Sequence, residues 1–333
     1  MQAKNISIKI KSKMEDWLLT IDNKALRKRV SENLLVSGGC ITSMLLDEKV
    51  NDYDIYIQDM DVLHDLVKYY VKPYKDAITI WDGRKKDELT KKNSESIFDL
   101  DEGEELLSGE DGRSVAFRTL KDDQIKIFVN SGRGGYDVKE MKDLNDTINT
   151  SLDIFENKET KSEPDVETKY FPLYFSPNAI TLSDGIQIII RFWGDHTQIH
   201  NNFDFIHATN YFTMTDNLVT NTRALESILA KQLYYQGSLF PITSIIRMRK
   251  FMKREWNINA GDILKILFQV SQLDLTNLDV LEEQLIGVDV VYFKNLIDDL
   301  RDFHKGKKIN SEDINKIIDI VFNSVMDEDQ EKY

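Results

Sequence analysis

Cysteine, proline and glycine are all scarce in this chain, and each scarcity narrows what the protein can be. The 333 residues include 1 cysteine, 5 prolines and 15 glycines. A single cysteine excludes an intrachain disulfide framework and any cysteine-cluster site for zinc or iron–sulfur. Few prolines and glycines, together with a hydrophobic content of 41%, indicate ordered domains with buried cores, and the length suggests about two of them.

Positive charge and long apolar runs are scarce as well. The chain carries 43 basic and 57 acidic side chains, which gives a net charge of −14. A polyanion would meet an overall repulsive surface, which disfavours a nonspecific nucleic-acid coat protein but leaves room for a locally basic groove. No apolar run approaches the roughly 18 residues that cross a bilayer, and the amino-terminal segment lacks the apolar stretch of a signal peptide. We therefore expect a cytoplasmic protein without a membrane partner.

The amino-terminal part of the chain alternates between helical and strand patterns. Residues 14–33 carry apolar side chains at helical spacing and predict one amphipathic helix. A short apolar run at 34–37, two glycines and a helical run to residue 46 follow, and residues 53–58 alternate as a strand does. A helix at 60–70 and a strand at 77–81 complete this part. Strand, glycine turn, helix and strand in this order predict an α/β beginning.

The middle of the chain is polar, and the carboxyl third is helical. Residues 83–112 and 137–169 are charged and core-poor, and we interpret them as polar insertions. The remaining predicted strands are 114–120, 124–129, 170–175, 179–182, 186–193 and 204–214. Helical periodicity then marks residues 225–235, 243–256, 263–273, 280–303 and 313–325. The sequence thus predicts an α+β fold with one domain over residues 1–215 and an all-helical domain over 216–333.

Two neighbouring carboxylates and a glycine turn carry the clearest chemical signal. Asp52 and Asp54 stand at i and i+2 of a predicted strand, so both point to the same face. Like charges so close repel each other unless a cation lies between them, and Mg²⁺ prefers oxygen ligands. Gly38 and Gly39 stand between a strand and a helix, where backbone N–H groups and the helix N-terminus can meet an anion. Such equipment is typical of phosphoryl or nucleotidyl transfer.

The spacing of these features resembles a known family signature. In the class II tRNA nucleotidyltransferase and poly(A) polymerase family, part of the polymerase-β-like nucleotidyltransferase superfamily, it reads Gly-Gly-x-Val-Arg-Asp-x-Leu-Leu-Gly-x-x-x-x-Asp-x-Asp. Gly38 and Gly39 fall on its glycines without a gap, Asp52 and Asp54 fall on its metal-binding aspartates, and the leucines at 45 and 46 fall on its leucines. Either feature alone is common in turns and loops, whereas the joint spacing is rare.

Three positions depart from that signature. Thr42 stands where the family has arginine, Ser43 where it has aspartate, and Asp47 where it has glycine. In the family, the arginine and aspartate help to hold the nucleotide and the turn. The resemblance therefore assigns Thr42 and Ser43 to nucleotide binding, with an altered affinity for the triphosphate.

Two later segments resemble other parts of the same family. Residues 195–210 resemble the block that ends in Asp-Phe-Thr-x-Asn-Ala, in which the aspartate recognises the ribose, and Asp204 stands at its place. Residues 241–254 resemble the neck motif, with Arg247 and Arg254 in the family's relative register. Guanidinium groups suit bidentate phosphate contacts. A basic helix face that pairs with nearby acids is the competing interpretation.

The resemblance implies a fold, an activity and partners. The fold would be a nucleotidyltransferase head, a small mixed β-sheet with helices, followed by an all-helical neck and body. The enzyme would transfer a nucleoside monophosphate from a nucleoside triphosphate such as ATP to an acceptor hydroxyl, with Mg²⁺ or Mn²⁺ held by Asp52 and Asp54. The acceptor would be an RNA 3′ end, as in tRNA processing. Two alternatives remain: the same site nucleotidylates a protein or small molecule, or the chain is a catalytically silent binding protein.

Two possible metal sites each lack a third ligand in the sequence. No third carboxylate could be assigned to the metal site, because the strands predicted at 114–120 and 124–129 carry no convincing inward acid. His196 and His200 are spaced i, i+4, as a zinc-binding pair on a helix would be, but no third ligand is evident. An ordinary pair of histidines is the favoured interpretation.

Overall fold

The protein is described here by a computed structural model that covers residues 2–75, 77–82, 104–108, 114–118, 125–129, 136–138, 169–285, 312–316 and 319. The chain divides into two compact units. The sheet unit comprises Ile8–Leu35 and Asn51–Trp193, and the helical unit comprises Met1–Ser7, Val36–Val50 and Gly194–Tyr333. The chain thus passes between the units several times, so neither unit is one continuous segment.

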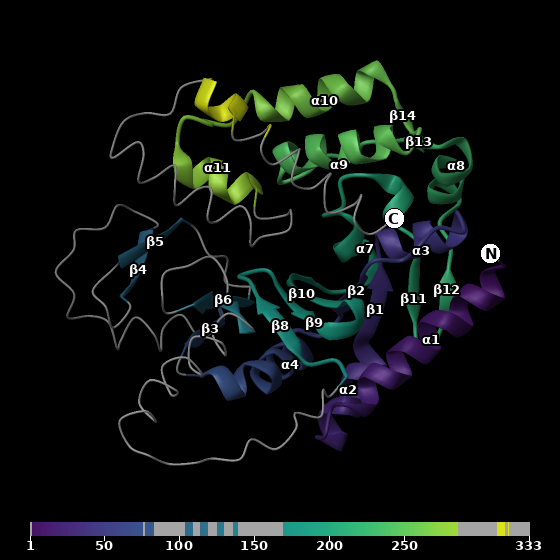
Figure 1. The fold of residues 1–333 in the computed structure, drawn as a ribbon, viewed down its shortest axis with the longest axis vertical. Helices are drawn as coiled ribbons and strands as arrows, with labels where there is room; N and C mark the ends of the chain where they lie inside the picture. The colour runs from purple at the N-terminus through teal and green to yellow at the C-terminus, as the bar shows by residue number, and fades with distance from the viewer. Residues whose placement is uncertain are drawn as a thin grey trace, which may run out of the picture. The chain divides into compact units, whose positions relative to one another are not determined.

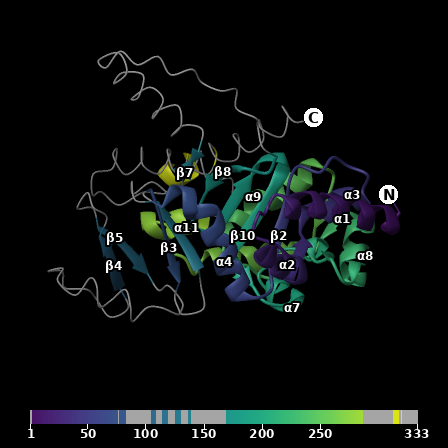
Figure 2. The same cartoon turned by 90° about the horizontal axis from the view of Figure 1, so that it is seen from below.

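The sheet unit contains five neighbouring strands of a mixed sheet, labelled in Figures 1 and 2. Its strand order is β2-β10-β9-β8-β7. Strand β10 pairs with β2 in parallel, whereas the other neighbours pair antiparallel. The bounds are β2 Tyr53–Ile57, β7 Tyr136–Asp137, β8 Pro172–Phe175, β9 Ala179–Leu182 and β10 Ile186–Trp193, with the 3-10 turn η3 at Ser183–Gly185 between β9 and β10.

One face of this sheet forms the core of the unit. Cross-strand neighbours Ile55, Ile188, Ile180 and Phe175 line up in register, and each has an exposed fraction of 0%. Residues between them in sequence point to the other face and are half-buried at most strand positions. The alternation that the sequence predicted for residues 53–58 is therefore an alternation between a packed face and a less covered one.

Three helices belong mainly to the sheet unit: α1 at Ala3–Leu19, α2 at Lys24–Asn33 and α4 at Met60–Val71, with the turn η1 at Lys72–Tyr74. Helix α4 packs on β2 and β10, and Trp17 of α1 donates a hydrogen bond to the Tyr70 hydroxyl at 2.9 Å. The prediction of a single helix over 14–33 is wrong, because α1 ends at Leu19 and a second helix begins at Lys24. Asn23 caps α2 by accepting from two backbone N–H groups, which begins a second helix.

Four short strands complete the described part of the sheet unit. They are β3 Ile78–Asp82, β4 Glu104–Ser108, β5 Ser114–Arg118 and β6 Ile125–Val129. Strand β3 pairs with β6 and β4 pairs with β5, both antiparallel. Strand β4 lies inside the predicted polar insertion 83–112, where adjacent leucines interrupt the acidic run. The remaining residues of the two predicted insertions lie largely outside the described part of the chain.

In the middle segment of the helical unit, the end of β1, Leu34–Ser37, leads into α3 at Gly39–Leu45. Its last segment contains α7 His196–His200, η4 Ile206–Ala208, β11 Tyr211–Thr213 and β12 Asn217–Val219. The strand predicted over 204–214 is only partly present, because residues 206–208 coil into η4 before β11 begins. Thr209 stabilises that turn by donating its hydroxyl to the Ile206 carbonyl at 2.7 Å.

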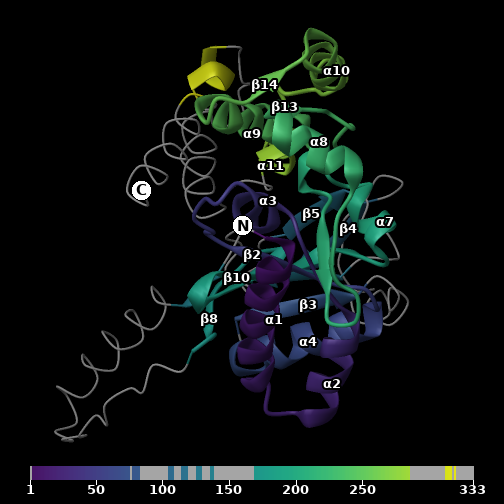
Figure 3. The ribbon, with the colours of Figure 1, turned by 90° about the vertical axis from the view of Figure 1, so that its right-hand side faces the viewer.

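Helices dominate the rest of the helical unit, as Figure 3 shows. They are α8 Thr222–Ala230, α9 Pro241–Lys253, α10 Ala260–Val270 and α11 Leu278–Leu285, with the two-strand pair β13 Gln232–Leu233 and β14 Asn257–Ile258. Helix α8 ends earlier than predicted because Lys231 adopts a left-handed φ of 45°. Most of the helices predicted at 280–303 and 313–325 falls outside the described residues.

The aromatic core of the helical unit joins residues from several elements. Phe205, Leu233, Tyr235, Trp256 and Ile266 are buried in one cluster together with Ile228. Leu45 and Leu46, from the end of α3, pack against this cluster. The predicted α+β class is confirmed by the sheet and the helices, whereas the predicted boundary near residue 215 stays a prediction. Among the described residues, no helix is long and apolar enough to cross a membrane.

Candidate active site

The two predicted metal-binding aspartates lie at the beginning of β2. Asp52 is exposed and immediately precedes the strand, and Asp54 is half-buried on it. Since they are two residues apart on extended chain, their side chains project to the same face. Asp54 is paired in register with Gln187 of β10, so an amide side chain lies beside that carboxylate on the neighbouring parallel strand.

A close backbone contact fixes the segment that leads into Asp52. Gly185 has a φ of 67°, and a Cβ at this position would lie 2.6 Å from the carbonyl oxygen of Asn51. Only glycine combines this left-handed conformation with such a close approach. The turn between β9 and β10 therefore rests directly on the residue before Asp52, which limits how far that carboxylate can move.

The predicted phosphate turn lies in the helical unit and is held by the segment 206–210. Gly38 has a φ of 96° and a ψ of −152°, a conformation that favours glycine, and its N–H donates to the Ala208 carbonyl at 3.1 Å. Ser37 is completely buried, and its hydroxyl donates to the Asn210 carbonyl at 2.8 Å. Gly39 begins α3 and is exposed, with no atom within 4 Å of the place a Cβ would take.

The two residues that replace the family's arginine and aspartate differ in exposure. Thr42 is 1% exposed and donates its hydroxyl to the His207 carbonyl at 3.1 Å. Ser43 is half-buried, and its carbonyl accepts from the N–H of Glu48 at 2.8 Å. Thr42 therefore ties the turn to η4, and Ser43 is the more accessible of the two.

Both predicted nucleotide-binding arginines form internal ion pairs. Nη1 of Arg247 donates to Oδ2 of Asp204 at 2.8 Å, and the Asp204 side chain is 9% exposed. Arg254 pairs with Glu48 and also lies over the Phe251 ring, with the guanidinium 5.0 Å from the ring centroid. Both contacts link protein to protein, as the competing interpretation of the basic helix expects, and the assignment of Asp204 to the ribose stays a prediction.

His207 lies at the centre of this region. Its ring is 4.4 Å from that of Phe251 and 5.0 Å from that of Trp256, measured between centroids. Burial lowers the pKa of His207 to about 4, with the nearby Asp204 opposing that shift. The ring is therefore neutral at pH 7 and acts as part of the aromatic core, and its buried Nδ1 has no hydrogen-bond partner within the described structure.

The predicted histidine pair is part of a stacked cluster. Nε2 of His200 lies 2.9 Å from the Ser37 hydroxyl, and His196 stacks on Tyr211 with 4.6 Å between ring centroids. Burial lowers the pKa of His200 to about 4. With one nitrogen of His200 engaged by Ser37 and the ring of His196 stacked, the pair is structural.

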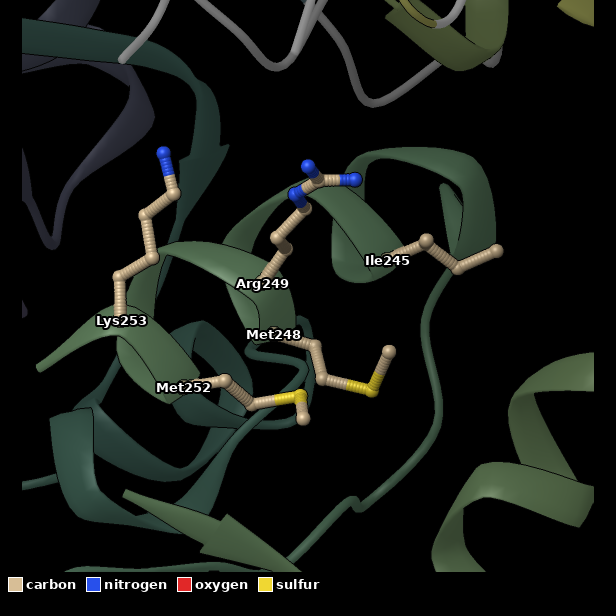
Figure 4. A pocket seen from close by; sticks show the side chains of 5 residues that line it. All are labelled: Ile245, Met248, Arg249, Met252 and Lys253. Atoms are coloured by element: carbon tan, nitrogen blue, oxygen red, sulfur yellow. The ribbon is translucent and has the colours of Figure 1, made fainter. Parts of the chain in front are cut away.

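A surface pocket lies on α9, shown in Figure 4. Its described lining combines three apolar side chains, Ile245, Met248 and Met252, with the cations Arg249 and Lys253. The two cations extend to one side in this view and the two methionine side chains to the other. Arg247 and Arg254 do not line it. The basic character predicted for 241–254 is thus divided between internal ion pairs and this pocket.

The predicted site residues fall into two groups. Asp52 and Asp54 belong to the sheet unit, whereas Gly38, Gly39, Thr42, Ser43, Asp204, Arg247 and Arg254 belong to the helical unit. Within the residues that the structure describes, no group of three or more His, Cys, Asp or Glu side chains could hold a metal ion. Sequence reasoning missed Gln187, because only the strand register reveals that a residue 133 positions away is the neighbour of Asp54.

Two solved structures of tRNA-processing enzymes are similar to this chain. A Thermotoga maritima CCA-adding enzyme complexed with tRNA is 11% identical, with a TM-score of 0.35, and the match covers 90% of this chain and 57% of that one. A tRNA nucleotidyltransferase complexed with a primer tRNA and an incoming ATP analogue is 10% identical, with a TM-score of 0.32 and coverage of 84% and 61%. The chain therefore spans less than two thirds of either enzyme.

Sequence comparison identifies the family. A protein of Bacillus phage SPbetaL7 called Gabija anti-defense 2 is 25% identical over 146 residues, which are 43% of this chain and 34% of the relative. The chain thus matches about a third of that protein's length. The model of the Gabija anti-defense 2 family matches residues 8–231, more than half of the chain. This protein belongs to the Gabija anti-defense 2 family.

Proposed function

We propose that this protein is a metal-dependent nucleotidyltransferase that acts against Gabija. The observation that carries the proposal is the placement of Asp52 and Asp54 on one face at the beginning of β2, beside Gln187 and behind a glycine-fixed turn. The family name supplies the biological setting, and the spacing of the glycine and aspartate motifs supplies the reaction class.

The residues at this end of β2 fit a hard divalent cation. Asp52 and Asp54 offer carboxylate oxygens, and the amide oxygen of Gln187 is of the same donor type. Mg²⁺ commonly binds through one or two carboxylates and substrate phosphates while it keeps several waters, so two acids suffice. When bound, Mg²⁺ or Mn²⁺ would neutralise charge that develops on the phosphates. Asp52 and Asp54 would hold it, and Gln187 would orient Asp54.

The remaining predicted residues receive roles in nucleotide binding. We assign triphosphate contacts to the turn at Gly38 and Gly39 and to Ser43, whereas Thr42 would hold that turn through its bond to η4. Asp204 would meet the ribose, and Arg247 and Arg254 the base or phosphates, once their ion pairs with protein carboxylates exchange for the ligand. The cost of that exchange predicts weak binding of free nucleotide.

Transfer of labelled nucleotide tests the activity. The purified chain is incubated with each α-³²P-labelled nucleoside triphosphate and Mg²⁺ or Mn²⁺. Acceptors are total RNA, which the resemblance implies, and the proteins of a Gabija-carrying cell. We expect one acceptor to gain label, and Asp54→Asn to lower the rate about a hundredfold or more. Glu15→Gln, which removes one negative charge from an exposed position of α1, should leave the rate unchanged.

The variants also show what would contradict the proposal. Thermal unfolding should be close to wild type for Asp54→Asn, so that lost transfer reflects chemistry and not misfolding. Labelling that persists in the Asp52→Asn, Asp54→Asn double variant would remove these carboxylates from the reaction. Absence of labelling with every nucleotide and both acceptor pools would reject a transferase.

A second candidate, binding of a Gabija component without catalysis, is favoured by the internal ion pairs. Arg247 and Arg254 already contact Asp204 and Glu48, as they would in a chain that no longer binds nucleotide. Phage infection of cells that carry Gabija separates the two candidates. If the wild-type protein protects the phage from Gabija and the Asp54→Asn variant does not, the result supports the enzyme. If the variant still protects the phage, the result supports the binding protein.

A further inference from the structure

A row of polar side chains crosses the five neighbouring strands of the sheet unit, from the candidate metal site on β2 to the edge strand β7. The strand registers pair Asp54 with Gln187, Gln187 with Thr181, Thr181 with Tyr174 and Tyr174 with Asp137. Paired residues project from the same face of a sheet. All five are half-buried, so each is partly accessible. We call these five residues the polar row.

The polar row differs in polarity from the neighbouring rows of side chains on the sheet. The adjacent row on the opposite face consists of fully buried apolar side chains, from Ile55 to Phe175. On the same face, the next cross-strand pair is Ile189 with Ala179, both apolar. A line of hydrogen-bonding groups beside this apolar pair suits a polypeptide, which presents both kinds of group along its length.

The charge of the polar row distinguishes among acceptors. One carboxylate lies at each end, Asp54 and Asp137, and none of the five side chains is cationic. Arg191 is a cation on β10, but it comes four residues beyond Gln187 and is not part of the polar row. Its guanidinium lies 5.7 Å from the centroid of the Phe192 ring. An RNA backbone brings one negative charge per nucleotide and needs cations along its path. A segment with a lysine or arginine would be attracted instead.

The length of the polar row sets the spacing of the features it would recognise. Neighbouring strands in a sheet are about 4.8 Å apart, so five strands span roughly 19 Å. An extended chain covers that distance in about six residues, at about 3.3 Å each. A hydroxyl beside Asp54 would therefore be about six residues from a cation beside Asp137.

We propose that the acceptor is a serine, threonine or tyrosine hydroxyl of a polypeptide that lies along the polar row, with a basic residue about six positions away. This inference rests on the proposed nucleotidyl transfer and names its acceptor. The acceptor oxygen attacks the α-phosphorus, and a new O–P bond forms as the bond to the bridging oxygen breaks. Pyrophosphate leaves with the electron pair, and the hydroxyl proton passes to solvent.

Synthetic acceptors test this assignment in the full-length chain. One fluorescent peptide carries a single serine with a lysine six residues away on each side, and a matched peptide has glutamate at both lysine positions. A single-stranded RNA with a free 3′ hydroxyl is the third acceptor. Fluorescence anisotropy measures binding without nucleotide, and transfer of α-³²P label measures the reaction. We expect the lysine peptide to bind best and to gain label on its serine.

Variants of the far end of the polar row separate recognition from chemistry. For the lysine peptide, Asp137→Asn should raise the dissociation constant and KM about threefold, as expected for one partly exposed ion pair, with kcat unchanged. Tyr174→Phe removes one hydroxyl of the polar row and should act in the same direction. Glu15→Gln, an equal loss of charge on α1 of the same unit, should change neither constant.

Each outcome decides the inference. Label on the RNA but on neither peptide overturns it and leaves the transferase standing. Equal binding of the two peptides, or an Asp137→Asn variant that binds the lysine peptide as wild type does, also overturns it. Preferential binding of the lysine peptide that depends on Asp137 supports the surface even if no acceptor is labelled, in which case the proposed transferase fails by itself.

Discussion

Gly38 and Gly39 stand side by side in the sequence but tolerate a side chain very differently. Gly38 adopts a φ of 96° with a ψ of −152°, whereas a Cβ on Gly39 would meet no atom within 4 Å. We expect Gly38→Ala to lower the free energy of unfolding by about 2 kcal/mol, because a left-handed extended conformation strains any other residue. Gly39→Ala, in the first turn of α3, should be neutral or slightly stabilising. Urea denaturation of both variants measures the difference, and equal losses would contradict this interpretation of the turn.

His207 makes the stability of the protein depend on pH. Its pKa in the folded protein is about 4 against 6.5 for an ordinary histidine, so the unfolded chain binds the extra proton first. The stabilisation is fully present above pH 6.5 and is lost as the pH falls from there toward 4. The expected loss is about 3 kcal/mol.

Substitution of that residue isolates its contribution. His207→Phe places a non-titrating ring among Phe205, Phe251 and Trp256. It should reduce the pH dependence between pH 6.5 and 4 and leave the part that His200 contributes. The free energy of unfolding at several pH values, measured with urea for both proteins, gives the comparison. Parallel curves for the two proteins would show that the ring is not the titrating group.

At the scale of elements, the break between α1 and α2 depends on a single cap. The side chain of Asn23 accepts from the N–H groups of Ala25 and Leu26, both at 3.1 Å. Asn23→Ala should cost about 1 kcal/mol of folding stability, while Asn23→Asp should retain most of it because a carboxylate caps equally well. Thermal unfolding followed by circular dichroism distinguishes the pair, and indistinguishable midpoints for the alanine and aspartate variants would count against a capping role.

The register of β10 against β2 predicts an effect on metal affinity. Gln187→Glu would place a third carboxylate beside Asp54. We expect the Mg²⁺ concentration for half-maximal transfer to fall roughly tenfold, because ligand charge tunes affinity for hard cations. Without Mg²⁺ the same variant should unfold at a lower temperature, since three like charges then repel.

The same substitution at a nearby glutamine outside the site provides the control. Gln58→Glu makes the same substitution just beyond the carboxyl end of β2, away from Asp52 and Asp54. It should leave the Mg²⁺ dependence unchanged. An identical response in both variants would mean that added charge, and not its place in the sheet, determines the effect.

Local patterns in the sequence predicted most of the elements, while long-range pairing could not be predicted. Alternation located β2, and helical periodicity located α4, α9 and α10, because both patterns report which side of an element is buried. Gln187 was missed because its importance comes only from a parallel pairing across 133 residues. The ion pair of Arg247 with Asp204 was likewise invisible, since the sequence shows charges but not which of them meet.

At the scale of the whole molecule, the helical part takes some of its core from earlier in the chain. Phe205 is 1% exposed within the aromatic cluster, and Leu45 and Leu46 pack against it. We expect a fragment of residues 216–333 to lack a cooperative thermal transition, because the cluster loses these contacts. Circular dichroism of the fragment beside the full-length chain measures this, and a sharp transition in the fragment would establish residues 216–333 as an independent domain.

Cys40, the single cysteine of the sequence, lies in α3 with 4% of its surface exposed, next to the Gly38 turn. Its thiol points to the Ser37 carbonyl, 3.8 Å away. A maleimide or an iodoacetamide can reach this sulfur only when the turn opens. The rate of alkylation therefore depends on how often the turn opens. The thiol of Cys40 is therefore a natural probe of the predicted nucleotide turn. If ATP binds at this turn, alkylation of Cys40 should be slower in the presence of ATP.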